Sequence, residues 1–206
     1  VGSSVAEMLV RAGVGRLTLI DCDIVNESNL NRQMIALRST LGKSKVEVAG
    51  ERYIDINPSV RLNLIKEYLS EDNVVSLLSA EKFDFVVDAI DTLSPKIKLL
   101  LHCLKNDIPV ISAMGAGGKT DPGCIRQTDI SKTFQCPLAK TVRRELKLNG
   151  IFKGLPVVFS TEPTNREAVI GVDNERNKKS TVGTVSYMPV VFGCHMSAYV
   201  IKKLIN

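Results

Sequence analysis

A dense group of polar residues follows the apolar run that ends at Ile20. Asp21 and Asp23 come first, and three asparagines, Arg32 and Gln33 follow within ten residues of Asp23. A surface loop can be polar without this mixture of carboxylates, amides and a guanidinium group. Carboxylates accept hydrogen bonds from hydroxyl groups, and a guanidinium group binds the oxygens of an anion. The stretch therefore indicates a binding site for a charged, polar ligand at the end of a buried strand.

Lys45 adds a second cation to this group. Ser44 and Glu47 have the spacing of a capping box, so Lys45 is expected at about the first position of a helix. A cation there opposes the helix dipole by about 0.3–1 kcal/mol. Two interpretations stay open: a solvated lysine, or a lysine that holds an anion together with Arg32.

A second pair of acids, Asp88 and Asp91, ends another apolar run. Carboxylates at Asp21 and Asp91 suit a ribose and a divalent metal ion. Cations at Arg32 and Lys45 suit phosphate groups, and two of them fit ATP better than NAD, which has no γ-phosphate. The alternative for any single acid is that it caps a loop. Taken together, these residues favour an ATP site.

The elements that must position these residues alternate along the chain. Such alternation with short connections predicts an α/β fold with a doubly wound, mostly parallel sheet of the Rossmann type and a C-terminal helix. Ligands of such sheets bind beyond the carboxyl ends of the strands, where Asp21 and Asp91 lie. The periodicity predicts helices at 3–13, 44–56, 71–80 and 94–106, and strands at 16–21, 60–65, 83–88 and 108–113.

The chain is expected to form one domain over residues 1–206. Residues 114–182 break the alternation and are expected to be a variable insertion within it. The chain opens without methionine, at the expected start of a helix. The free N–H groups of a helix start attract phosphate, so Gly2 is expected to belong to the site. We therefore expect a strand and a glycine-rich turn before Val1.

Three motifs of the first 113 residues, SNLNRQ, GKSKVEVA and DAIDT, occur in this order. Together they resemble the adenylating domain of ubiquitin-activating enzymes, ThiF and MoeB. The resemblance implies that Asp91 binds Mg²⁺ and acts in catalysis with Arg32, and that an arginine of a partner subunit completes the site. Its counterpart would precede Val1. The implied nucleotide site consists of Gly2, Asp21, Asn29, Arg32, Gln33, Lys45 and Asp91.

The second half of the chain narrows the resemblance. ISAMGAGGKTDPGCIRQTDISKT, PLAKTVRRELK and VVFSTE are similar to the tRNA threonylcarbamoyladenosine dehydratase branch, whereas residues 163–182 match it poorly. This resemblance implies ATP-dependent dehydration of threonylcarbamoyladenosine in the tRNA anticodon loop, through activation of its carboxylate. It further implies ATP and Mg²⁺ as cofactors, tRNA as substrate, a homodimer, and a sulfur-transfer protein as a candidate partner.

The five cysteines are widely spaced and contain no Cys-x-x-Cys pair. They predict reduced thiols in a cytoplasmic protein and no zinc site. Cys136 stands where the dehydratase branch commonly has an acid, and it is either a chance replacement or a reactive thiol. The largely apolar residues 182–201 include Pro189 and His195, which favours a packed terminal helix over a membrane span.

The segment 137–150 is expected to be a helix with an apolar stripe at Leu138, Val142 and Leu146. Its basic residues lie away from the stripe and would contact tRNA phosphates; the alternative is an ordinary solvated face. The net charge of +5 is compatible with an anionic partner without deciding the matter. The basic residues of this segment are Lys140, Arg143, Arg144 and Lys147.

Three other functions compete with tRNA dehydration. A ThiF- or MoeB-type enzyme would adenylate the C-terminal glycine of a ubiquitin-like sulfur carrier, but such enzymes usually carry two cysteine pairs for zinc. An inactive subunit of an activating enzyme would tend to lose Arg32, Lys45 or Asp91, and all three are present. An NAD dehydrogenase would need an acid–base pair for hydride transfer, and none is evident in the sequence.

Overall fold

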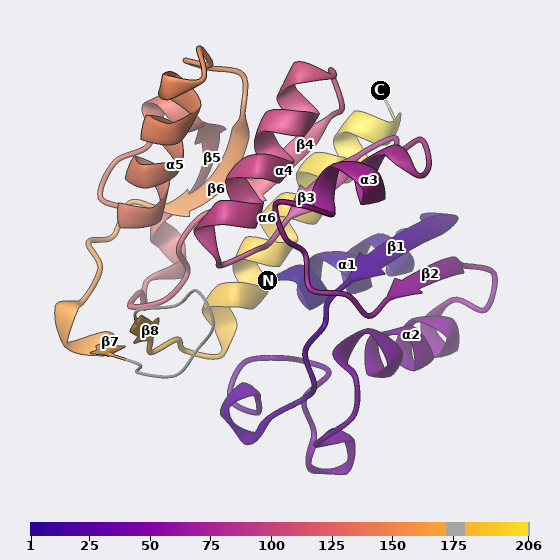
Figure 1. The fold of residues 1–206 in the computed structure, drawn as a ribbon. Coiled ribbons are helices and arrows are strands. Elements are labelled where there is room, and N and C mark those ends of the chain that lie inside the picture. The colour runs from indigo at the N-terminus through magenta and orange to yellow at the C-terminus, as the bar shows by residue number, and fades with distance from the viewer. Residues whose placement is uncertain (172–179, 206) are drawn as a thin grey trace.

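The strands of this computed structural model, which describes residues 1–171 and 180–205, lie in three sheets (Figure 1). β1 and β2 pair in parallel. Four strands form the largest sheet in the order β3-β4-β6-β5, in which β5 alone runs antiparallel to its neighbour. β7 and β8 form a small antiparallel pair. The strands are β1 (Arg16–Ile20), β2 (Arg61–Ile65), β3 (Val86–Asp88), β4 (Val110–Ala113), β5 (Ile125–Asp129), β6 (Pro156–Ser160), β7 (Val169–Gly171) and β8 (Ser180–Val182).

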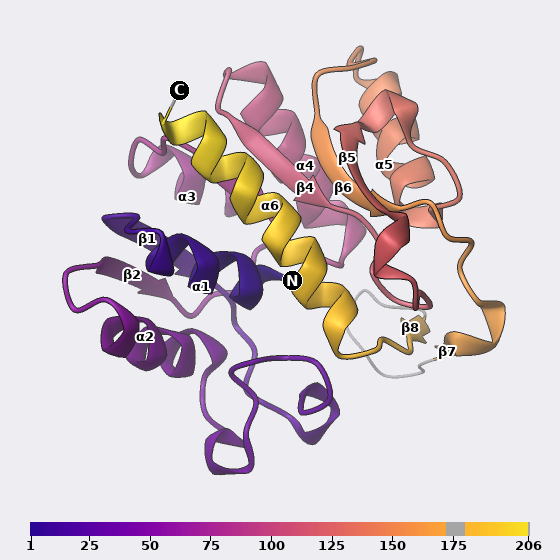
Figure 2. The ribbon, with the colours of Figure 1, turned by 180° about the vertical axis from the view of Figure 1, so that it is seen from behind.

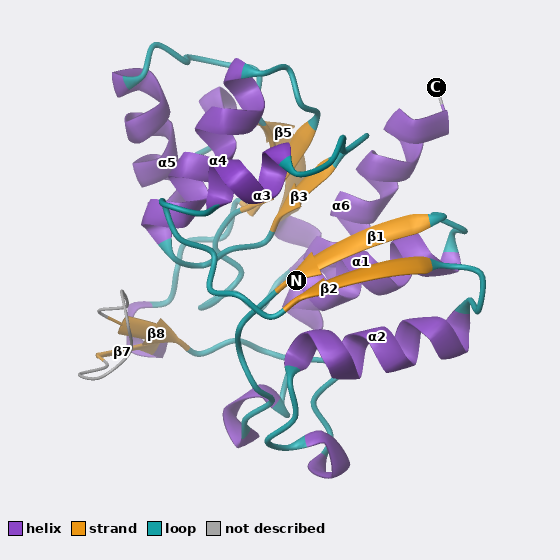
Figure 3. Cartoon of the chain, turned by 45° about the vertical axis from the view of Figure 1, so that its right-hand side comes forward, coloured by secondary structure: helices purple, strands orange, loops and turns teal. Residues whose placement is uncertain are grey.

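Helices cover both faces of the four-stranded sheet. In Figure 1, α4 and α5 lie in front of it, and Figure 2 shows α6 on the opposite face with α1 beside it. α2 packs beside β2, as Figure 3 shows. The α-helices are α1 (Gly2–Arg11), α2 (Lys45–Ile56), α3 (Val74–Ser79), α4 (Leu93–Lys105), α5 (Pro137–Leu148) and α6 (Tyr187–Ile205). Short 3₁₀ helices span Glu27–Asn29, Arg38–Thr40, Pro122–Cys124, Ile130–Lys132 and Arg166–Ala168.

The two layers of helices bury separate apolar clusters. One cluster joins α4 and α5 to the sheet through buried side chains such as Leu100 and Leu146. A second joins α1 and α6 to the other face through Val5, Phe192 and Met196. A third fills the space between α1, α2 and the β1–β2 pair. This arrangement confirms the predicted doubly wound α/β fold with a C-terminal helix.

The segment 114–182 is more closely integrated than the sequence analysis expected. β6 lies within it and pairs in parallel with β4, and β5 then pairs with β6. The expectation of an insertion is therefore corrected for these two strands, which complete the main sheet. β5 was missed because it reads IRQTD and has no apolar run, whereas β6 has the apolar run PVVFS but stands in a segment where strands and helices do not alternate regularly. Residues 172–179 of the poorly matching stretch lie outside the described residues.

The parallel strands that carry the candidate acids belong to different sheets. β1 ends just before Asp21, β3 ends at Asp88, and these two strands are not paired with each other. One continuous sheet was expected, and within residues 1–171 and 180–205 no strand pairs with both of them. The predicted strand and glycine-rich turn before Val1 stay a prediction.

α1 and α6 cross at close range. A Cβ atom added to Gly193 of α6 would lie 2.5 Å from the Cβ of Ser4 and 3.2 Å from the backbone nitrogen of Val5. Glycine is therefore required here for the close approach of the two backbones. In the described part of the chain, none of the helices is long and apolar enough to cross a membrane.

Candidate functional site

The loop after β1 joins the candidate acids to the start of α2. The backbone N–H of Asp23 donates to Oδ1 of Asp21 at 2.9 Å, and the ammonium group of Lys45 pairs with Oδ2 of Asp23 at 2.7 Å. The backbone N–H of Lys45 also donates to the Asp23 carbonyl oxygen at 3.0 Å. The Lys45 side chain is 11% exposed, so it is not a solvated surface lysine. The prediction that Lys45 begins α2 is confirmed.

Asp21 and Asp91 act on each other electrostatically, although they follow different strands. Burial raises the pKa of the Asp21 carboxyl above its ordinary value, and the negative charges of Asp23 and Asp91 raise it further. The Asp23 N–H and the Lys45 charge act in the opposite direction. Asp91 itself is exposed. The end of β1 and the loop after β3 therefore meet at one edge of the molecule.

The start of α1 faces the same group of charges. The charges of Arg32, Lys45 and Asp91 lie within electrostatic reach of the backbone nitrogen of Val1. A Cβ atom added to Gly2 would lie 3.4 Å from the Cβ of Ala89, in the loop after β3. The first turn of α1 contains no acidic residue. A helix N-terminus without an acid can accept a phosphate group at its free N–H groups.

The loop that carries Arg32 is held by its own polar side chains. Asn29 is buried, and its Oδ1 accepts the backbone N–H of Asn26 at 3.1 Å, which closes the turn. Nη1 of Arg32 donates to the Ser28 carbonyl oxygen at 2.6 Å and to Oδ1 of Asn31 at 2.9 Å. These bonds fix the direction of the guanidinium group before any ligand binds.

Gln33 and Asn31 anchor this loop at two further points. The backbone N–H of Gln33 donates to the Asn29 carbonyl oxygen at 2.9 Å, which continues the turn. Nδ2 of Asn31 donates to the carbonyl oxygen of Thr184, just before α6, at 2.9 Å. This long-range contact has no signal in the sequence. The predicted phosphate-binding roles of Asn29 and Gln33 stay predictions.

The two acids of the DAID motif have different surroundings. Asp88 is fully buried and forms an ion pair with Lys96 at 2.6 Å, while the Ser112 hydroxyl donates to it at 2.5 Å. The Lys96 ammonium also donates to the carbonyl oxygens of Ile90 and Ala113, at 3.0 and 2.9 Å. Asp88 thus fixes the loop, and the exposed Asp91 is presented to solvent. Sequence reasoning chose Asp91 and missed Lys96, because a lysine in a helix ordinarily faces solvent.

α5 begins at Pro137, as predicted, and its own residues Val142 and Leu146 are fully buried. The expected cationic ridge needs one correction. Nη1 of Arg143 donates to the carbonyl oxygen of Thr133 at 2.9 Å and also bonds the Thr133 hydroxyl. Arg143 is therefore half-buried and tied to the preceding loop, because its position borders the buried stripe.

The remaining basic residues of α5 are exposed. Lys140 lies in the first turn and Lys147 in the last, and Arg144 pairs with the neighbouring Glu145 at 2.8 Å. Cys136, directly before the helix, is buried; a Cβ atom on Gly115, just beyond β4, would lie 3.6 Å from its sulfur. The start of α5 therefore lies at the carboxyl edge of the sheet, the edge at which β1 and β3 present their acids.

Among the described residues, one group of three potential metal ligands is close together. Donor atoms of Asp21, Cys22 and Asp23 lie within 4.8 Å of one another. Exposed neighbouring acids are common without an ion, and Asp91 does not belong to this group. The predicted absence of zinc stays a prediction.

Comparison with known proteins places this geometry in a family. The family description that matches residues 1–206 is the ThiF family. The chain belongs to the ThiF family. A relative in Bacillus subtilis (strain 168), named tRNA threonylcarbamoyladenosine dehydratase, is 42% identical over 213 residues, which cover 100% of this chain and 84% of the relative.

Other members of the ThiF family support the same placement. The crystal structure of E. coli tRNA N6-threonylcarbamoyladenosine dehydratase, TcdA, in complex with ATP has a TM-score of 0.88 and 37% sequence identity, and the match covers 100% of this chain and 82% of that one. A molybdopterin-synthase adenylyltransferase of Salmonella typhimurium (strain LT2) is 35% identical over 111 residues, or 54% of this chain and 44% of the relative. Similarity to the dehydratases thus extends over the whole chain, while this adenylyltransferase matches about half of it.

Proposed function

We propose that this protein is an ATP-dependent tRNA threonylcarbamoyladenosine dehydratase. The observation that carries the proposal is similarity over the whole of this chain to the Bacillus subtilis dehydratase, at 42% identity. The local geometry agrees with it, since Asp21, Lys45 and Asp91 gather beside the start of α1. The substrate is threonylcarbamoyladenosine in the anticodon loop of tRNA.

The reaction proceeds in two steps, adenylation of the carboxylate and closure of a ring. The threonylcarbamoyl carboxylate attacks the α-phosphorus of ATP, and pyrophosphate leaves. An oxygen or nitrogen of the neighbouring urea then attacks the activated carbonyl carbon, a ring closes, a proton is released and AMP leaves. The tRNA has lost one water, while ATP has become AMP and pyrophosphate. No cysteine forms a covalent intermediate, so Cys136 needs no catalytic role.

The chain contributes charge and orientation to this chemistry. Asp21 accepts hydrogen bonds from the ribose hydroxyls, while Arg32 and Lys45 neutralise the phosphates. The N–H groups at Gly2 add a partial positive charge. In binding ATP, Lys45 exchanges the exposed carboxylate of Asp23 for phosphate oxygens.

Mg²⁺ is proposed as the accompanying ion. The exposed carboxylate of Asp91 is the hard oxygen donor that Mg²⁺ prefers. When bound, the ion would neutralise negative charge on the phosphates. We further propose a cytoplasmic homodimer in which an arginine of the partner subunit completes the site, with a sulfur-transfer protein as a candidate partner.

Mass spectrometry of nucleosides tests the function directly. The intact protein is incubated with ATP and unfractionated tRNA, and the tRNA is then digested. Loss of one water from threonylcarbamoyladenosine, together with AMP and pyrophosphate, is expected. If the nucleoside stays unchanged while a ubiquitin-like carrier protein becomes adenylated at its C-terminal glycine, the ThiF- or MoeB-type alternative replaces this proposal.

Substitutions at Arg32 and Asp91 test the site. Arg32→Ala and Asp91→Ala should each lower turnover by at least about 10-fold while the circular dichroism spectrum is retained. Each change removes a charge-assisted contact worth about 1.5–3 kcal/mol, and Asp91→Ala also removes the Mg²⁺ ligand. Arg38→Ala, which changes an exposed arginine of the same loop, is the matched control and should keep full turnover. Full turnover in both site variants would refute the assignment.

A further inference from the structure

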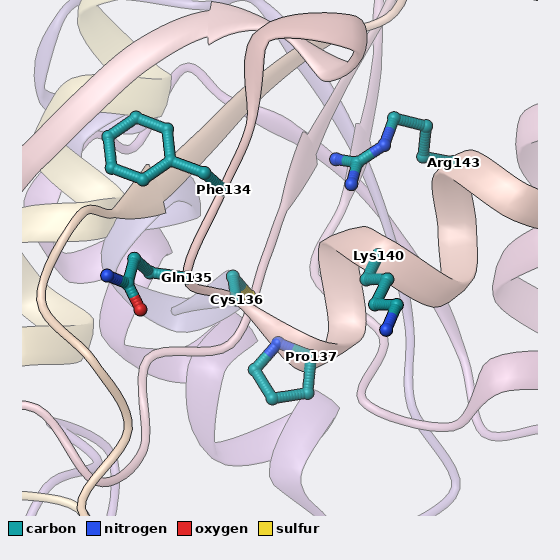
Figure 4. Close-up of a pocket in the computed structure, with 6 residues that line it drawn as sticks. All are labelled: Phe134, Gln135, Cys136, Pro137, Lys140 and Arg143. Carbon is teal, nitrogen blue, oxygen red and sulfur yellow. The ribbon is translucent and has the colours of Figure 1, made fainter.

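A concave surface lies at the start of α5. The pocket there has a volume of about 310 Å³. Figure 4 shows Phe134 and Gln135 on one side of the turn into the helix, and the two basic side chains on the helix itself. None of the six lining residues is acidic. The lining residues are Phe134, Gln135, Cys136, Pro137, Lys140 and Arg143.

Phe134 is exposed but held in place. The residue is 55% exposed, and its ring meets the buried ring of Phe159 edge to face, with centroids 5.6 Å apart and an interplanar angle of 77°. Most aromatic surface is buried in folded proteins, so an exposed yet anchored ring suggests a partner. Any of the nucleic-acid bases can stack on such a ring, because each base has a planar π-face.

The polypeptide around Phe134 is fixed in an unusual shape. Gln135 has φ +57°, a left-handed conformation that is costly for residues with a side chain. Thr133, the residue before Phe134, is tied to α5 by two hydrogen bonds from Arg143. Such strain persists where the surroundings determine the backbone, and it is common at binding sites.

The charge of the pocket suits a phosphodiester. Lys140 is exposed in the first turn of α5, and Arg143 supplies a second positive charge on the same wall. An aromatic ring beside basic side chains is the combination that binds single-stranded nucleic acid. An acidic peptide would use the two cations but would leave the Phe134 ring unexplained.

The position of the pocket relates it to the candidate ATP site. Cys136 lies beside Gly115, just beyond the carboxyl end of β4, whereas Asp21 and Asp91 lie beyond β1 and β3 at the same edge. An RNA loop that delivers a carboxylate to the ATP site would pass along this edge. A nucleotide next to the reacting one would then reach the start of α5.

We propose that this pocket binds a nucleotide that flanks the modified adenosine in the tRNA anticodon loop. The flanking base stacks on Phe134, and Lys140 contacts its phosphate. The inference rests on the proposed tRNA substrate and adds the residues that grip the loop. The reacting adenosine itself binds elsewhere, at the ATP site.

Binding of an anticodon stem–loop RNA tests the pairing of base and ring. The RNA carries threonylcarbamoyladenosine and a fluorophore, and two further RNAs lack the base on the 5′ or the 3′ side of it. Fluorescence anisotropy with the full-length protein gives each dissociation constant. Phe134→Ala should weaken binding about 5- to 150-fold, the usual range for a base–aromatic stack. Loss of the base at one of the two positions should weaken binding equally, and the two changes combined should cost no more than either alone.

Matched variants separate stacking from general damage. Phe134→Trp keeps an aromatic face and should bind within about twofold of the unaltered protein. Phe152→Ala removes another exposed phenylalanine, just after α5, and should leave the affinity unchanged. Thermal unfolding of each variant reports the loss of the Phe159 contact independently of binding.

Two outcomes overturn the inference, and they differ in what they say of the function. If the unaltered protein dehydrates the RNA but the effects of Phe134→Ala and of base removal simply add, or neither base matters, this inference alone fails. If the unaltered protein neither binds nor dehydrates the RNA, the proposed function fails with it.

Discussion

Asp21 carries a charge whose burial opposes folding. Because its pKa is raised, mainly by burial, the folded chain binds this proton more tightly than the unfolded chain does. Above the raised pKa the ionised carboxylate therefore lowers stability, and this loss fades as the pH falls through that pKa toward the ordinary value of 3.8. The cost is expected of a residue kept for binding.

Asp21→Asn tests this cost. The variant should be more stable than the unaltered protein at pH 7, because asparagine keeps an oxygen for the Asp23 N–H and removes the buried charge. The difference should shrink as the pH is lowered toward about 4, in urea unfolding followed at several pH values. ATP affinity should fall in the same variant. Equal or lower stability at pH 7 would contradict the predicted direction.

Sequence reasoning at this scale found the charged groups but not their partners. Asp21, Arg32, Lys45 and Asp91 could be chosen because their types and order are informative. The pairing of Lys45 with Asp23, and of Lys96 with Asp88, depends on contacts across 22 and 8 positions that the sequence does not specify.

At the scale of elements, α1 and α6 depend on one glycine. Gly193→Ala should lower the free energy of unfolding by about 1–3 kcal/mol, because the new Cβ atom would lie 2.5 Å from the Cβ of Ser4. The gain of about 1 kcal/mol in helix propensity is already included in this net loss. Gly15→Ala, where no atom lies within 4 Å of the new Cβ, is the control. The free energies of unfolding are measured with urea. Equal values for the two variants would contradict the prediction and would show that α1 and α6 can move apart at no cost.

The exposed cations of α5 give a prediction about electrostatics. The double reversal Arg144→Glu and Lys147→Glu should weaken tRNA binding and flatten its dependence on salt. The logarithmic slope should change by about 0.9 for each phosphate group that the helix no longer neutralises. Arg143 is left unchanged because it ties the helix to Thr133. The measurement is tRNA affinity in a titration series from low to high salt, and the ATP affinity of the variant should stay nearly equal to that of the unaltered protein.

The matched control for this experiment lies on the opposite face of the sheet. Lys202→Glu together with Lys203→Glu, in the last turn of α6, changes the net charge equally. An equal loss of tRNA affinity in both double variants would reduce the effect to net charge. The face of α5 would then be an ordinary solvated surface.

The sequence predicted elements with a regular apolar pattern best, although it also missed β6, whose apolar run PVVFS lies outside the regular alternation. α2, α4 and α5 were located to within a few residues because they have apolar stripes and polar flanks. β5 lacks such a pattern and gains its pairing from β6, so only the fold defines it. The close crossing of α1 and α6 could not be predicted either, because an isolated glycine is tolerated in a helix without any close contact to another helix.

At the scale of the whole molecule, the spacing of the cysteines leads to a prediction about the zinc content of this ThiF family member. We expect elemental analysis of the purified protein to find no stoichiometric zinc, since no two cysteines have ligand spacing. A ThiF- or MoeB-type member with two cysteine pairs serves as the positive control. One zinc per chain would overturn the prediction and require ligands that are distant in the sequence.

Lys96 has a consequence for the kinetics of the molecule. Its ammonium group holds the end of β3, the loop at Ile90 and the end of β4 together, so the loop that presents Asp91 is ordered before any nucleotide arrives. The conformational entropy of that loop is lost once, when the chain folds, and not again at each turnover. Nucleotide thus meets a preorganised surface, and its association rate should be set by diffusion and not by a loop closing around it.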